Sequence, residues 1–119
     1  MIKFGKEKVL LLHKLLGEQT GGGIGIRDEK LLDSALESVY QTFEGKELYP
    51  SKLEKAAQLC FALISNHAFI DGNKRIGMYV MLSFLEISGI HLEITDAEVV
   101  GVARKVAKKE MNAIDILNL

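Results

Sequence analysis

The sequence predicts an all-α protein, a compact helical bundle with a central buried helix and a short β-hairpin. Apolar residues recur at helical spacing along most of the chain, and one segment is apolar on nearly every face. A single glycine-centred segment interrupts the helical pattern, as a hairpin would. The length of 119 residues fits one domain, which we expect to span 1–119.

Two helices are expected in the first third of the chain. The first covers 6–16 and ends at Gly17, and the glycine-rich stretch 21–25 follows as a turn. This stretch lacks the lysine and hydroxyl residues of a phosphate-binding loop. Asp28 is expected to cap the second helix. The expected apolar faces are Val9, Leu12, His13 and Leu16 in the first helix and Leu31, Leu32, Ala35, Leu36 and Val39 in the second.

The hairpin is expected within 41–49, around Gly45. Ser51 then caps a third helix that runs to about Asn66. This helix is expected to bury Leu53, Ala56, Ala57, Cys60 and Ile64. The interpretation of Cys60 is a small buried hydrophobe, not a reactive thiol.

The segment 76–87 is apolar nearly all round, which is typical of the central helix of a bundle, and Gly89 should end it. A short extended stretch at 91–94 follows. Thr95 opens a further helix to about Lys109 with a capping box, and 112–119 is expected to form a last short helix.

The composition excludes several classes of function. The formal net charge of −1 provides no overall basic field, so no direct nucleic-acid binding is expected. One cysteine cannot form an internal disulfide. No secretion signal or membrane-spanning segment is recognisable, so we expect a cytoplasmic protein without a membrane partner.

A polar loop between the two strongest helices carries the candidate chemistry. A helix that begins near Asn73 offers free N–H groups and a positive dipole end to an anion. Lys74 and Arg75 have the wrong sign for that end, which is explained if a phosphate binds there. Gly72 allows the backbone to approach a ligand closely. Asp71 is an oxygen ligand suited to Mg²⁺ shared with phosphates.

His67 can accept a proton from a hydroxyl group near neutral pH. Each residue also has a structural interpretation on its own: His67 as a helix cap or buried polar group, Asp71 and Gly72 as a turn, and Lys74 with Arg75 as a solvated pair. Phe69 is expected to be a structural anchor between the flanking helices.

The spacing His67-x-Phe69-x-Asp71-Gly72-Asn73-Lys74-Arg75 resembles the signature of the Fic/Doc (filamentation and death-on-curing) family. Similar segments extend over most of the chain, in 25–28, 31–36, 43–50 and 84–89. The resemblance implies a helical bundle whose signature loop joins two central helices. It also implies an enzyme that modifies protein hydroxyl groups with Mg²⁺ and ATP as the co-substrate.

The resemblance further implies a role for each residue of the motif. His67 would be the general base, Asp71 would hold Mg²⁺, and 72–75 would hold phosphates. The hairpin would be a flap that aligns the target peptide by strand addition. The implied flap residues are Thr42, Phe43, Glu44, Gly45, Lys46, Glu47, Leu48 and Tyr49.

Two positions depart from the adenylylating branch of the family, which has glycine in place of Lys74 and arginine in place of Met78. Both departures resemble the death-on-curing branch, a group of toxins that transfer the terminal phosphate to elongation factor Tu and are silenced by an antitoxin. The leading hypothesis is therefore a toxin kinase with a protein substrate and an antitoxin partner. Protein adenylylation (AMPylation) and a nucleotide-responsive binding module with little catalysis are the alternatives.

Overall fold

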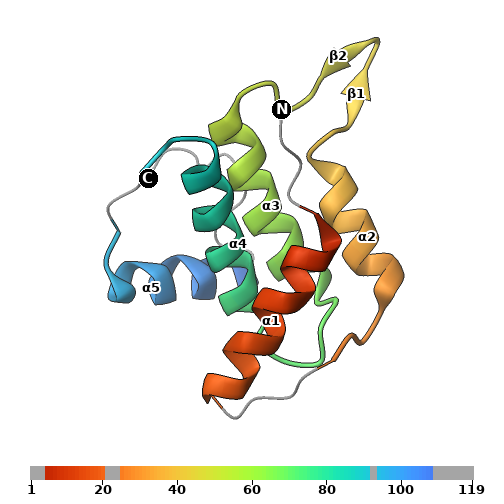
Figure 1. Cartoon of the computed structure of the whole chain (residues 1–119). Coiled ribbons are helices and arrows are strands. Elements are labelled where there is room, and N and C mark those ends of the chain that lie inside the picture. The colour runs from red at the N-terminus through yellow and green to blue at the C-terminus, as the bar shows by residue number, and fades with distance from the viewer. Residues whose placement is uncertain (1–4, 21–24, 92–93, 109–119) are drawn as a thin grey trace.

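The computed structural model describes residues 5–20, 25–91 and 94–108, and these form five helices and a two-stranded hairpin (Figure 1). The predicted all-α fold with a short hairpin is confirmed. No described helix is long and apolar enough to cross a membrane. The elements are α1 (Lys6–Thr20), α2 (Glu29–Ser38), β1 (Thr42–Phe43), β2 (Lys46–Glu47), α3 (Lys52–Asn66), α4 (Asn73–Ile87) and α5 (Asp96–Ala107).

Helices α3 and α4 form the centre of the bundle, and α1, α2 and α5 pack around them (Figure 1). The close approach of α3 to α4 depends on Gly77, because a Cβ atom there would lie 2.6 Å from Ile64 Cγ1. The predicted central helix is therefore confirmed. Its buried residues are Asn73, Ile76, Gly77, Met78, Val80, Met81, Phe84 and Leu85.

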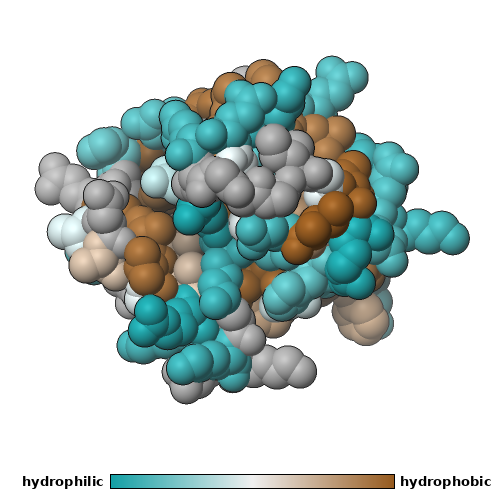
Figure 2. All heavy atoms as spheres, turned by 90° about the horizontal axis from the view of Figure 1, so that it is seen from below, coloured by the Kyte–Doolittle hydropathy of each residue, from teal (hydrophilic) through white to brown (hydrophobic). Residues whose placement is uncertain are grey.

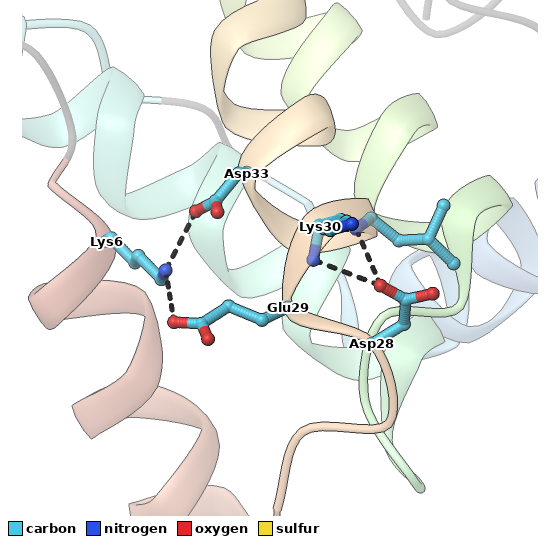
Figure 3. A network of polar contacts seen from close by, with 6 residues as sticks. Lys6, Asp28, Glu29, Lys30 and Asp33 are labelled. Atoms are coloured by element: carbon cyan, nitrogen blue, oxygen red, sulfur yellow. Dashed lines mark hydrogen bonds and ion pairs between the residues drawn. The ribbon is translucent and has the colours of Figure 1, made fainter.

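Helix α1 is longer than predicted, since it continues through Gly17 to Thr20. A glycine inside a helix costs only about 1 kcal/mol, which tertiary packing can offset. Ion pairs from Lys6 Nζ to Glu29 at 2.6 Å and to Asp33 at 2.8 Å join α1 to α2 (Figure 3). Asp28 caps α2 as predicted, accepting hydrogen bonds from the first-turn N–H groups of residues 30 and 31 (Figure 3).

The hairpin turns at Glu44 and Gly45, whose φ angles of 52° and 78° are both left-handed. Such a turn matches the twist of paired strands. All strand residues are exposed, and a two-stranded ribbon is marginally stable in water without further support. The hairpin must therefore be held at its base.

Lys55 of α3 supplies that support, and its side chain is fully buried. Its Nζ atom donates to Glu47 Oε1 at 3.0 Å and to the carbonyl oxygen of Tyr49, and it lies 5.9 Å from the centre of the Tyr40 ring. Tyr40 precedes β1, Glu47 belongs to β2, and Tyr49 follows β2. One buried cation thus fixes both ends of the hairpin to α3.

Some sequence-based expectations differ from the structure. Leu53 is 45 % exposed, because it lies in the first turn of α3, before the helix enters the core, whereas Leu59 and Leu63 are buried. Thr95 and Glu98 form the predicted capping box of α5. Residues 91 and 94 form no strand, and 92–93 and the expected helix at 112–119 lie outside the described residues.

Candidate active site

The loop between α3 and α4 is paired with an extended segment that precedes α2. Ile26 and Phe69 form an antiparallel bridge, in which Arg27 N donates to Ala68 O at 2.7 Å and Ile70 N donates to Gly25 O at 3.2 Å. In this arrangement the N–H and C=O groups of Ile26 point away from the loop. Neither group has a partner within the described residues.

On the other side of the bridge, the side chain of Asn73 is hydrogen-bonded to both backbone groups of Phe69. Its Oδ1 accepts from Phe69 N and its Nδ2 donates to Phe69 O, both at 3.0 Å. The Asn73 side chain is buried, so its amide stabilises the loop and is not directed toward an anion in the cavity. The phosphate contact expected of Asn73 can therefore come only from its backbone N–H group.

Phe69 is 2 % exposed and lies at the centre of the loop, where a structural anchor is expected. His67, by contrast, is exposed and ends α3 in a left-handed conformation with φ 50°. Arg27 holds this end of α3, since its Nε donates to His67 O at 2.8 Å and its guanidinium also reaches Asn66 O at 3.4 Å. The His67 ring is thus attached to a fixed backbone and faces solvent.

Helix α4 begins at Gly72, which has φ 77° and provides no side-chain cap. The first N–H groups of a helix have no partner inside the helix, and here no side chain caps them. Together with the helix dipole, they form a site suited to an anion. Lys74 and Arg75, both exposed in the first turn, add positive charge beside it.

These groups surround one cavity of about 450 Å³. Figure 2 shows the molecule from the end at which the loop between α3 and α4 lies in Figure 1, and both hydrophilic and hydrophobic residues are exposed there. Lys74 and Arg75 also line a second hollow of about 320 Å³, which reaches Tyr79 on α4 and Arg104 on α5. The first cavity is lined by His67, Ile70, Asp71, Gly72, Asn73, Lys74 and Arg75.

Asp71 is the carboxylate of this cavity, and its Oδ1 accepts from Gly72 N at 2.8 Å. The described residues contain no cluster of three or more side chains able to hold a metal. Mg²⁺ is usually bound by one or two carboxylates together with substrate phosphates and water. An exposed carboxylate beside an anion site fits such a shared ion, but not a metal held by the protein alone.

The hairpin, whose residues 42–49 were predicted as a flap, does not lie beside this loop. It precedes α3, whereas the loop follows α3, and the two lie at opposite ends of that helix (Figure 1). Fifteen residues of α-helix span about 22 Å. None of the cavity residues belongs to the hairpin. The extended segment beside the loop is instead the one around Ile26.

Two residues in contact with the loop were not predicted as part of the site. His13, expected only on the apolar face of α1, is 4 % exposed and reaches the Asp71 backbone. A histidine among leucines on a buried face signals such a polar contact. Arg27, directly before the capping Asp28, carried no signal by itself, because its partners are 39 and 40 residues away.

Comparison with known proteins identifies the family of the chain. The profile of the Fic/DOC family matches residues 3–85, which is more than half of the chain. The chain is also 42 % identical over 72 residues to the protein named Toxin Doc from Mycolicibacterium smegmatis (strain ATCC 700084 / mc(2)155), covering 60 % of this chain. The match spans about half, 55 %, of that relative's length. The chain belongs to the Fic/DOC family.

Proposed function

We propose that this protein transfers the γ-phosphate of ATP to a serine or threonine hydroxyl group of a target protein in the cytoplasm. One observation carries the proposal: an exposed histidine and the uncapped, cationic N-terminus of α4 share one cavity. A base and an anion site in the same cavity are what the transfer of a phosphate to a hydroxyl group requires.

In this reaction His67 accepts the hydroxyl proton as the oxygen attacks the γ-phosphorus. A new P–O bond forms to the target, the bond between the γ-phosphorus and the β–γ bridging oxygen breaks, and ADP leaves with that electron pair. The His67 Nδ1 atom lies 3.4 Å from Ser65 O, a weak contact in which Nδ1 must donate. That tautomer leaves Nε2 free to act as the base.

The remaining residues of the cavity bind and orient the phosphates. Asn73, Lys74 and Arg75 line the cavity, so the backbone N–H groups of 73–75 and the side chains of Lys74 and Arg75 would bind the phosphates. Arginine can hold a phosphate through two parallel hydrogen bonds. Asp71 would hold Mg²⁺ together with phosphate oxygens, and the bound ion would neutralise charge on the transferred group. Gly72 begins α4 in a left-handed conformation, which favours glycine because it disfavours residues with a side chain.

The target segment is proposed to pair with the outer edge of the extended segment at 25–27. The N–H and C=O groups of Ile26 point outward there, and the same segment bridges the loop that carries His67. An extended peptide can add a strand to such an edge, which would bring its hydroxyl side chain toward the cavity.

The toxin role is a further part of the proposal, and it is supported by similarity to a protein named Toxin Doc. A toxin of this kind would have an antitoxin protein as its partner. Elongation factor Tu is the first target to test, as the resemblance to the death-on-curing branch implies. Expression of the chain alone should arrest bacterial growth, and co-expression of the adjacent small open reading frame should relieve the arrest.

The decisive experiment uses ATP labelled separately at the α- and γ-phosphates. The protein is incubated with Mg²⁺, each labelled ATP and either purified elongation factor Tu or a bacterial lysate. Label from the γ-position on a protein is expected. Label from the α-position would replace the proposal with adenylylation, and no label from either position would leave a nucleotide-responsive binding module.

A further inference from the structure

His13 is a buried polar residue of α1 that the proposed reaction does not use. Its ring stacks on Phe69 with 3.9 Å between ring centres and 15° between ring planes. Its Nε2 atom lies 2.7 Å from the carbonyl oxygen of Asp71. A Cβ atom on Gly72 would lie 3.6 Å from the same nitrogen. One side chain from a distant helix therefore contacts Phe69 and Asp71 of the signature loop and lies next to Gly72.

The contact with Asp71 fixes the protonation of the His13 ring. A backbone carbonyl oxygen can only accept, so Nε2 must carry a proton. This hydrogen bond persists whether Nδ1 is protonated or not. His13 therefore serves as a constant donor to the loop, unlike His67, whose proposed role requires one nitrogen to accept.

The position of this contact along the loop gives it a specific consequence. Pairing with 25–27 and the Asn73 amide hold the loop at 68–70, and Arg27 holds it at 66–67. At Asp71 and Gly72, the described residues provide one long-range polar contact, and it comes from His13. These two residues carry the proposed Mg²⁺ ligand and the start of α4.

We propose that His13 is a positioning residue, which holds the turn at Asp71 and Gly72 so that the Asp71 carboxylate and the N-terminus of α4 face the same cavity. Its catalytic consequence rests on the proposed phosphate transfer, whereas its effect on the loop does not. Residues that orient a metal ligand typically change metal affinity or activity by about 10- to 100-fold when they are replaced.

Two substitutions separate the two contacts. His13→Phe keeps an aromatic ring to stack on Phe69 and removes the donor, whereas His13→Gln keeps a donor and removes the ring. The matched control is His91→Phe, because His91 is highly exposed and far from the loop in sequence. Thermal melting and circular dichroism first establish that each variant is folded.

The first readout needs no activity. In ¹⁵N-labelled protein, the His13 ring should show a protonated Nε2, and His13→Phe should shift the amide signals of Asp71 and Gly72 while His91→Phe should not. An unprotonated Nε2 in the wild type, or unchanged loop signals in His13→Phe, would overturn the inference.

The second readout is the affinity for ATP in the presence and absence of Mg²⁺, measured by calorimetry together with kcat. Folded His13→Phe should lose about 10- to 100-fold in the Mg²⁺-dependent part of binding or in kcat, and His13→Gln should recover part of it. Wild-type values in His13→Phe would overturn the positioning role. If wild-type protein binds no ATP, the proposed function fails, and the loop signals still decide the role of His13.

Discussion

The sulfur atoms of Met78 and Cys60 lie 3.5 Å apart at the contact between α4 and α3. Both residues are completely buried. Position 78, where the adenylylating branch has an arginine, therefore faces the core here and is not among the residues that line the cavity. In this chain the position contributes to packing.

Replacing Met78 with arginine should therefore destabilise the fold. A guanidinium group without a buried partner should cost about 3–5 kcal/mol of unfolding free energy. Urea unfolding followed by circular dichroism measures the loss. Met78→Leu is the control, with an expected cost below about 1.5 kcal/mol, because it nearly conserves volume. Equal stability of the arginine variant would mean that its side chain reaches solvent.

Gly77→Ala should destabilise the contact between α3 and α4. The new methyl group would lie 2.6 Å from Ile64 Cγ1 and 3.1 Å from Cys60 O, and overpacking of this kind costs about 1–3 kcal/mol. Gly101→Ala is the matched control, since its Cβ atom would meet open space in another helix. That change should stabilise the protein by roughly 0.5–1 kcal/mol. If the free energy of unfolding changed in the same direction in both variants, the proposed clash at Gly77 would be contradicted.

Lys55→Met should loosen the hairpin while the helices stay folded. It removes the charged donor shared by Glu47 and the Tyr49 carbonyl. Amide hydrogen exchange within 42–48 should accelerate about tenfold or more, because hydrogen bonds to charged groups contribute about 1.5–3 kcal/mol. Lys46→Met, which removes an exposed charge from the hairpin itself, should not accelerate it. Unchanged exchange in Lys55→Met would show that the anchor is dispensable.

Cys60 should resist alkylation in the native protein. Burial raises the pKa of its thiol to about 12 from an ordinary value of 9.0, so the reactive thiolate is scarce near pH 8. Mass spectrometry should detect modification by iodoacetamide only after unfolding. The raised pKa also predicts that stability is lost as pH rises above 9.0, where only the unfolded state ionises this group. Cys60→Ala should lack that part of the pH dependence, and rapid native alkylation would refute the assignment.

His67→Ala should lower phosphate transfer by ~10²–10⁴-fold, the usual effect of losing a general base. The ring is exposed, so the melting temperature should change little. His91→Ala provides the control for removing an exposed histidine. Near-wild-type transfer by a folded His67→Ala protein would exclude the proposed base.

The helices were predictable because their signals are local. Asp28 and Thr95 cap the helices that follow them, and the apolar surface of 76–87 indicated the central position of α4. The end of α1 was not predictable from Gly17, because packing offsets the small cost of a glycine in a helix. The exposure of Leu53 depends in the same way on where the neighbouring helices lie.

The sequence predicted which residues form the loop of the candidate site, but it predicted their arrangement in space only in part. The sequence indicated a polar loop after Asn66 that leads into a helix near Asn73, and the structure has a loop at 67–72 followed by α4, with 67 and 70–75 lining one cavity. Local pattern also indicated the hairpin, but its distance from the loop follows from the direction of α3. Similarly, the buried amide of Asn73 and the contacts of His13 depend on segments that meet only in the folded chain.

The contact of Arg27 with the end of α3 has a consequence for the electric field at the site. The loop joins the negative pole of α3 to the positive pole of α4, so the two partial charges, each about half an elementary charge, would partly cancel. The Arg27 guanidinium donates to the carbonyl oxygens of Asn66 and His67, where the negative pole is concentrated. Arg27 therefore masks the negative pole of α3, and the positive pole of α4 dominates the field that an approaching nucleotide encounters. Arg27 has this effect without lining the cavity itself.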